Sequence, residues 1–137
     1  MLAISASVAL AQTKTYKTRL SPVPVPAFNP AIVGSGSVSG TMTGTKLTIS
    51  GSFDGLSTPA TAARVHKSPK TGVKGPVLFE LTVTKGANGG TSGTINGAFD
   101  LTAAQVQELA QGRYYVQLHS EKAPDGNLWG WLLEAKK

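Results

Sequence analysis

Residues 113–120 read RYYVQLHS, residues 121–127 read EKAPDGN and residues 128–134 read LWGWLLE. Successive side chains of a β-strand point to opposite faces of the sheet. In the first run this places Tyr114, Val116 and Leu118 on one apolar face. The middle run contains the turn-forming residues proline, aspartate, glycine and asparagine. The three runs therefore predict an antiparallel hairpin, with strands at 113–119 and 128–134 and one buried face.

Further strand patterns precede this hairpin at the spacing expected of an all-β domain. They lie at residues 32–42, 45–53, 62–67, 77–83 and 91–99. The clearest alternation is that of Val77, Phe79, Leu81 and Val83. A total of about seven strands with many turns predicts two packed antiparallel sheets with Greek-key connections, a β-sandwich.

One helix is predicted between the strands, over residues 102–111. Thr102 and Gln105 have the spacing of a capping box, and Leu101 with Val106 fits the hydrophobic staple. Gly112 follows at the position where helices commonly end in a left-handed residue. We expect this helix to cap one end of the sandwich.

The first 30 residues divide into two segments before the folded domain, which we place at residues 31–137. Residues 1–11 are uncharged and apolar and end in Ala9-Leu10-Ala11, the small-x-small form of a signal-peptidase site. We interpret them as the remnant of a signal peptide, with Gln12 at the start of the mature chain. Residues 12–30 contain prolines alternating with valines, which predicts an extended arm, either a linker or a first edge strand. After Gln12 no apolar run reaches the roughly 18 to 20 residues of a transmembrane helix.

The composition excludes several classes of function. The net charge is +6, and four of the cations lie between Arg64 and Lys74 without an acidic neighbour. Neither aromatic stacking platforms nor a basic helix accompany them, so we expect no nucleic-acid partner. The chain has no cysteine and no Gly-x-Ser-x-Gly or phosphate-loop pattern, and neither histidine has a sequence-level acid partner. We therefore predict a non-catalytic protein.

The hairpin, together with AARVH at residues 62–66 and GPV at 75–77, resembles the CHRD domain, a module named after chordin and common in secreted bacterial proteins. The resemblance implies a sandwich similar to copper/zinc superoxide dismutase or immunoglobulin domains. It also implies a periplasmic or secreted location and an accessory role.

The resemblance raises the question of a metal site. CHRD domains commonly carry His-x-His at the first segment, then a further histidine and a Pro-x-Gly-Glu-x-Arg-Gly turn. In this chain Arg64 stands at the first histidine position, Asn127 at that of the glutamate and Trp129 at that of the arginine. Only His66 and His119 remain, and the guanidinium of Arg64 repels a divalent cation. We therefore predict no cofactor, with copper or zinc binding through His66 and His119 as the alternative.

The substitutions suggest a contact surface. Tryptophan and arginine are the residues most enriched at interface hot spots, and a guanidinium stacked on an indole forms a cation–π pair. We predict that one binding face comprises Arg64, His66, His119, Trp129 and Trp131. The sequence thus predicts a secreted or periplasmic module that binds a protein partner or an extracellular polymer, carbohydrate included. The alternative for the tryptophans is that one ring belongs to the core.

Overall fold

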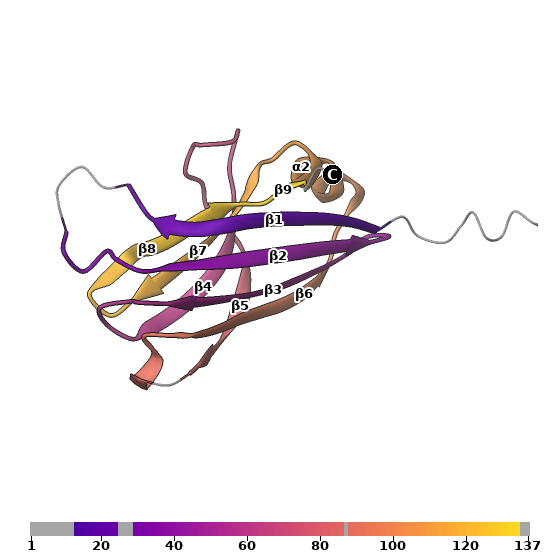
Figure 1. Ribbon diagram of the computed structural model, residues 1–137. Helices are drawn as coiled ribbons and strands as arrows, with labels where there is room; N and C mark the ends of the chain where they lie inside the picture. The colour runs from indigo at the N-terminus through magenta and orange to yellow at the C-terminus, as the bar shows by residue number, and fades with distance from the viewer. Residues whose placement is uncertain (1–12, 25–28, 87, 135–137) are drawn as a thin grey trace, which may run out of the picture.

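The computed structural model describes residues 13–24, 29–86 and 88–134, and nine strands with one α-helix make up this part of the chain (Figure 1). The predicted signal-peptide remnant, residues 1–11, lies outside the described residues. The strands are β1 (Thr13–Pro22), β2 (Ser35–Thr43), β3 (Lys46–Asp54), β4 (Ala60–Lys67), β5 (Val77–Lys85), β6 (Gly93–Asp100), β7 (Tyr114–Ser120), β8 (Ala123–Trp131) and β9 (Leu133–Glu134). A 3₁₀ turn, η1 (Asn88–Gly90), precedes β6, and the helix α2 (Ala103–Ala110) follows it.

The strands form a closed antiparallel barrel in the order β1-β2-β3-β6-β5-β4-β7-β8. The predictions of an all-β fold and of one short helix are confirmed, whereas the prediction of a sandwich is wrong. Two separate sheets would leave open edges, but β1 pairs with β2 along one side and with β8 on the other. Closure satisfies backbone groups that an edge strand would expose. The short β9 pairs with β1 at Tyr16 and Lys17, on the same edge as β8, and so extends the seam that closes the barrel.

Strand β1 lies within residues 12–30, which were predicted to be an arm before a domain starting at residue 31, either a linker or a first edge strand. Residues 13–22 of the expected arm belong to the barrel, with the side chains of Tyr16 and Leu20 buried in the core. Pro22 comes at the end of β1, where the missing backbone donor costs least. The sequence interpretation assigned residues 13–21 to the proline-containing arm, although they precede the first proline, Pro22.

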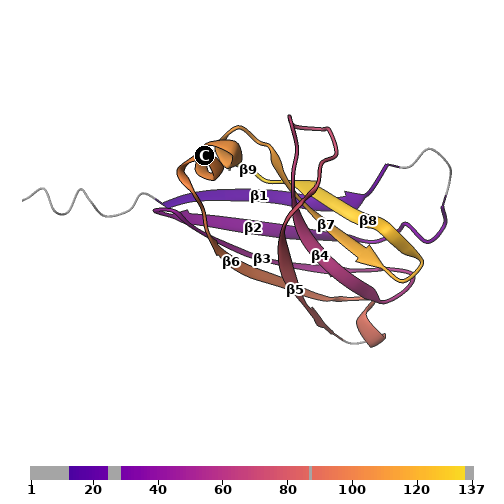
Figure 2. The ribbon, with the colours of Figure 1, turned by 180° about the vertical axis from the view of Figure 1, so that it is seen from behind.

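The connection from β6 to β7 is a Greek-key crossover that contains α2. Strands β4, β5 and β6 form a meander, and β7 returns to lie beside β4. Helix α2 occupies the end of the barrel in both views (Figures 1 and 2).

The predicted capping box is confirmed, because Thr102 Oγ1 accepts from Gln105 N and Gln105 Oε1 accepts from Thr102 N. Within the described residues, no helix is long and apolar enough to span a membrane.

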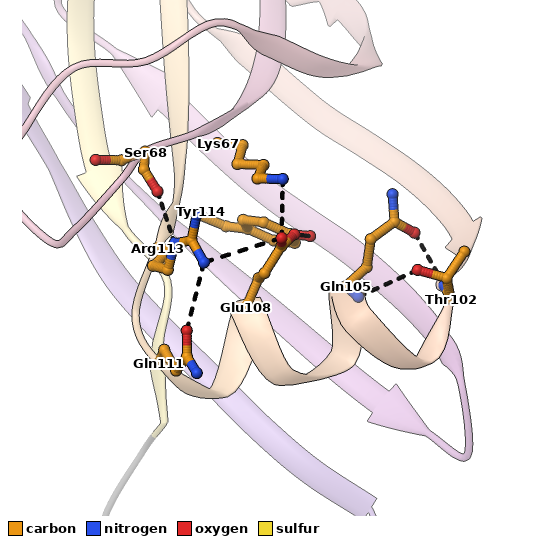
Figure 3. A network of polar contacts seen from close by, with 8 residues as sticks. All are labelled: Lys67, Ser68, Thr102, Gln105, Glu108, Gln111, Arg113 and Tyr114. Carbon is orange, nitrogen blue, oxygen red and sulfur yellow. Dashed lines mark hydrogen bonds and ion pairs between the residues drawn. The ribbon is translucent and has the colours of Figure 1, made fainter.

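Glu108 joins α2 to the barrel wall (Figure 3). Its carboxylate accepts a hydrogen bond from the Tyr114 hydroxyl at 2.8 Å and forms an ion pair with Lys67 at 2.8 Å. Arg113 Nη1 lies 3.9 Å away. The hydrogen bond from Lys67, followed by that from Tyr114, lowers the pKa of Glu108 below its usual value. Burial, with the Glu108 contact, raises the pKa of Tyr114.

We expect Glu108→Gln to lower the free energy of unfolding at neutral pH by about 1.5 to 3 kcal/mol, the range for hydrogen bonds to a charged group. Because the folded-state pKa is depressed, this stability is present above the unfolded-state value of 4.5 and is lost as the pH falls through the folded-state pKa. The free energies of unfolding of wild type and variant, measured by denaturant melts, should therefore differ at neutral pH and converge at acidic pH. Glu80→Gln is the matched control, since Glu80 is mostly exposed and its ion pair with Arg64 should contribute less than about 1 kcal/mol. An equal loss in both variants would contradict a special role for Glu108.

Strand β7 is buried on both faces along its whole length. Its inner side chains, Tyr114, Val116 and Leu118, are fully buried in the barrel core, as the sequence predicted. Its outer side chains, Tyr115, Gln117 and His119, are 1%, 5% and 6% exposed although they point away from that core. The outer face of β7 must therefore be covered by another part of the chain.

Candidate functional site

The five residues of the predicted binding face lie on the outer side of three neighbouring strands, β4, β7 and β8. Between β4 and β7, Arg64 is opposite Gln117 and His66 is opposite Tyr115. Between β7 and β8, Gln117 is opposite Trp129 and Tyr115 is opposite Trp131. We call this surface the outer patch, defined by Arg64, His66, Tyr115, Gln117, His119, Trp129 and Trp131.

Tyr115 is the centre of the outer patch, although the sequence interpretation did not single it out. Its ring stacks on His66 with centroids 4.8 Å apart. The same ring contacts Trp129 edge-on at 5.5 Å and Trp131 at 4.5 Å, and the two indoles meet edge-on at 5.6 Å. The signal was available, because strand parity places Tyr115 and Gln117 on the same face as His119.

The loop from β4 to β5, residues 68–76, folds over this face at Gly75. The Gly75 carbonyl accepts from His66 Nδ1 at 2.8 Å and from the Tyr115 hydroxyl at 3.1 Å. The same hydroxyl accepts from Gly75 N at 2.9 Å. The approach requires glycine, because a Cβ at this position would lie 1.9 Å from the Lys67 carbonyl oxygen. The loop thereby buries both rings, and burial raises the pKa of Tyr115.

A large bulge in β8 covers the other end of the patch. Leu118 pairs with Leu128 and Ser120 pairs with Ala123, so residues 124–127 stand opposite His119 alone. The bulge turns two carbonyls toward the patch. His119 Nδ1 donates to Pro124 O at 2.9 Å, and Gln117 Nε2 donates to Asp125 O at 3.1 Å.

Asn127 lies at the end of this bulge. Its side chain is fully buried. It accepts from Ser120 Oγ at 2.9 Å and donates from Nδ2 to Val33 O at 2.8 Å. These two contacts hold the bulge against the segment that leads into β2, which indicates a structural role for Asn127.

Both histidines are held in one tautomer. A backbone carbonyl can only accept, so Nδ1 of each ring carries the proton and Nε2 of the neutral ring presents a lone pair. His66 Nε2, His119 Nε2 and Gln117 Oε1 are buried and have no hydrogen-bond partner among the described residues. Burial lowers the pKa of His119, and the nearby charge of Arg64 lowers it further, while the Pro124 contact opposes both.

Arg64 does not stack on Trp129 as the sequence interpretation suggested. Gln117 of β7 lies between them in the register, which places Arg64 and Trp129 two strands, roughly 10 Å, apart. Instead, Arg64 Nε forms an ion pair with Glu80 Oε2 of β5 at 2.8 Å. The guanidinium therefore borders the outer patch with its charge balanced.

The carboxylates of Glu121 and Asp125 are not placed to act as metal ligands beside His66 and His119. Glu121 and Asp125 are exposed, and Asp125 contributes its backbone oxygen to the patch rather than its carboxylate. Among the residues that the structure describes, no group of three or more His, Cys, Asp and Glu side chains is placed to hold a metal ion. Among the described residues, the buried side-chain oxygen left without a hydrogen-bond partner beside the two histidines is Gln117 Oε1.

A comparison with protein-family models matches a span that includes all the residues described above. The model of the CHRD domain matches residues 16–132, from the middle of β1 to just beyond β8. The matched span contains the loop at Gly75, the bulge of β8 and every residue of the outer patch. Comparisons with curated proteins and with solved structures find no match. The chain belongs to the CHRD domain family.

Proposed function

We propose that this chain is a non-catalytic interaction module, secreted or periplasmic, that binds a protein partner through Trp129 and Trp131. The observation that carries the proposal is that both indoles remain partly exposed, while Tyr115, Gln117 and the two histidines of the outer patch are buried. Membership of the CHRD family, whose domains occur in extracellular and secreted proteins, supports the location.

The indoles are held in place before any partner binds. Each contacts Tyr115, whose ring is fixed by His66 on one side and whose hydroxyl is fixed by Gly75. A rigid aromatic anchor loses little conformational freedom on binding, which is why such residues dominate interface energetics. Lys17 and Arg19 on β1 are exposed, and the net charge is +6, so we expect the partner to present an acidic rim around an apolar pocket.

The test compares wild-type protein with Trp129→Ala and Trp131→Ala. Each is immobilised and exposed to the extracellular fraction of the source cells, and the retained proteins and polysaccharides are identified and titrated. We expect Trp129→Ala to weaken binding of a retained protein by about 2 kcal/mol or more, with a stability loss of only about 1 kcal/mol from the lost ring contacts.

Leu133→Ala is the control, because Leu133 is 47% exposed outside the outer patch. Retention of a polysaccharide rather than a protein would replace the proposed partner with an extracellular polymer. Equal binding by wild type and both tryptophan variants would refute the proposal, as would unfolding of Trp129→Ala, which would assign the ring to the core.

A further inference from the structure

Within the part of the chain that the structure describes, three buried polar atoms of the outer patch have no hydrogen-bond partner: His66 Nε2, Gln117 Oε1 and His119 Nε2. The imidazole centroids are 6.4 Å apart. Gln117 precedes His119 by two residues on β7, so their side chains share a face. An unsatisfied buried polar group costs about 1 to 3 kcal/mol, and native proteins keep few of them. Three within one patch indicate that something binds there.

All three atoms present lone pairs. The Nδ1 contacts with Gly75 O and Pro124 O leave both Nε2 atoms unprotonated in the neutral rings. The contact from Gln117 Nε2 to Asp125 O fixes the amide, so Oε1 is an acceptor. None of the three can therefore satisfy another. A single water has two hydrogens and would satisfy only two of them, whereas a cation is complementary to all three.

The histidines have the arrangement of metal ligands. In metal sites the second ring nitrogen usually donates to a carbonyl or carboxylate, which fixes the tautomer and the direction of the ring. Here both rings are held in this way by backbone atoms, one on the β4–β5 loop and one on the bulge of β8. The backbone contacts that would orient two metal-binding histidines are thus already present.

The distance between the two imidazole rings and the charge of the donor atoms indicate which ion fits the site. Two imidazoles that bind one ion at about 2.0 Å have their centroids about 5 Å apart at a tetrahedral angle and about 6.3 Å apart in a line. The observed 6.4 Å fits the line, which zinc does not adopt. The donors are neutral imidazole nitrogens, so they would not compensate a divalent charge. Monovalent copper is soft, carries a single charge and accepts two nitrogen ligands in a line.

We propose that Nε2 of His66 and Nε2 of His119 bind one monovalent copper ion, with Gln117 Oε1 as a weaker third donor. This site is independent of the proposed protein contact through the tryptophans. Gly75 and the bulge of β8 act as positioning elements, because they hold the rings through backbone carbonyls.

The first experiment titrates untagged protein with monovalent copper under anaerobic conditions, against a chromophoric copper chelator. We expect one equivalent to bind with submicromolar affinity, and zinc to bind more weakly. His66→Asn and His119→Asn should each weaken binding by about 100-fold or more, and Gln117→Ala by about 10-fold. Leu133→Ala should bind as wild type does. Absence of binding, or binding that survives both histidine substitutions, would overturn the site, and preference for zinc would overturn the assignment to copper.

A second measurement uses only the wild-type protein and so does not depend on the variants folding. Nitrogen-15 spectra of the two imidazoles should show Nδ1 protonated before copper is added. One equivalent of monovalent copper should then shift the Nε2 resonances of both rings while the Nδ1 protons remain. Unchanged Nε2 resonances in both rings would refute copper binding between them.

Discussion

Leu118→Ala is expected to lower the free energy of unfolding by about 2 to 5 kcal/mol, the range for leucine truncation in a close-packed core. The Leu118 side chain is fully buried and faces the centre of the barrel. Its strand, β7, is paired on both sides, with β4 and with β8, and is covered on its outer face as well. The surroundings therefore have little freedom to move into the cavity, which favours the upper part of the range.

Denaturant unfolding measures this change directly. The matched control is Leu133→Ala, a leucine that is 47% exposed and whose truncation should change stability by no more than about 0.5 kcal/mol. A loss below about 1 kcal/mol for Leu118→Ala would show that β7 is not at the centre of the core.

Gly75→Ala is expected to lower the free energy of unfolding by about 1 to 3 kcal/mol, as for an overpacked site. An added methyl would come within 1.9 Å of the Lys67 oxygen, so the β4–β5 loop would have to move off the barrel. Such a movement breaks the contacts of Gly75 with Tyr115 and His66 together. Near-ultraviolet circular dichroism should report it, since Tyr115 contacts both tryptophans.

The control for this loop is Val73→Ala, at a residue that is 38% exposed on the same loop. It should leave both the stability and the aromatic spectrum close to those of the wild type. If Gly75→Ala keeps the wild-type spectrum while losing stability, the loop has remained in place and the strain is absorbed elsewhere. That outcome would contradict the role assigned to Gly75.

Local rules applied to the sequence found β2 to β7, the second half of β8, the capped helix and the inner face of β7. They succeeded because parity and capping depend on residues a few positions apart. The same rules placed His66, His119 and the tryptophans on one outer side, where the structure has them. What parity does not reveal is burial. The outer face of β7 is covered by a loop and a bulge, neither of which follows from the pattern of the strand itself.

The clean alternation of residues 77–83 was a misleading guide to the centre of the core. A strand alternates clearly when one of its faces is in solvent, and Phe79 of β5 is only partly buried, stacked on Phe99 at 4.3 Å. The closure of the barrel could not be predicted from the strand patterns either, because it depends on pairing between segments that are distant in the sequence. Because of the prolines after residue 21, an arm was predicted over residues 12–30, which contain the core strand β1.

The strand that closes the barrel also sets the order in which the chain can fold. Ser21 of β1 pairs with Trp129 of β8, so two of the most distant parts of the described chain must meet before the last seam forms. Contacts of such long sequence separation make folding slow, because the loop must be closed before its contacts stabilise it. A chain synthesised from its N-terminus cannot complete this barrel until β8 has emerged. We therefore expect the newly made polypeptide to stay open, and to depend on chaperones, for longer than a protein of similar size built from local contacts.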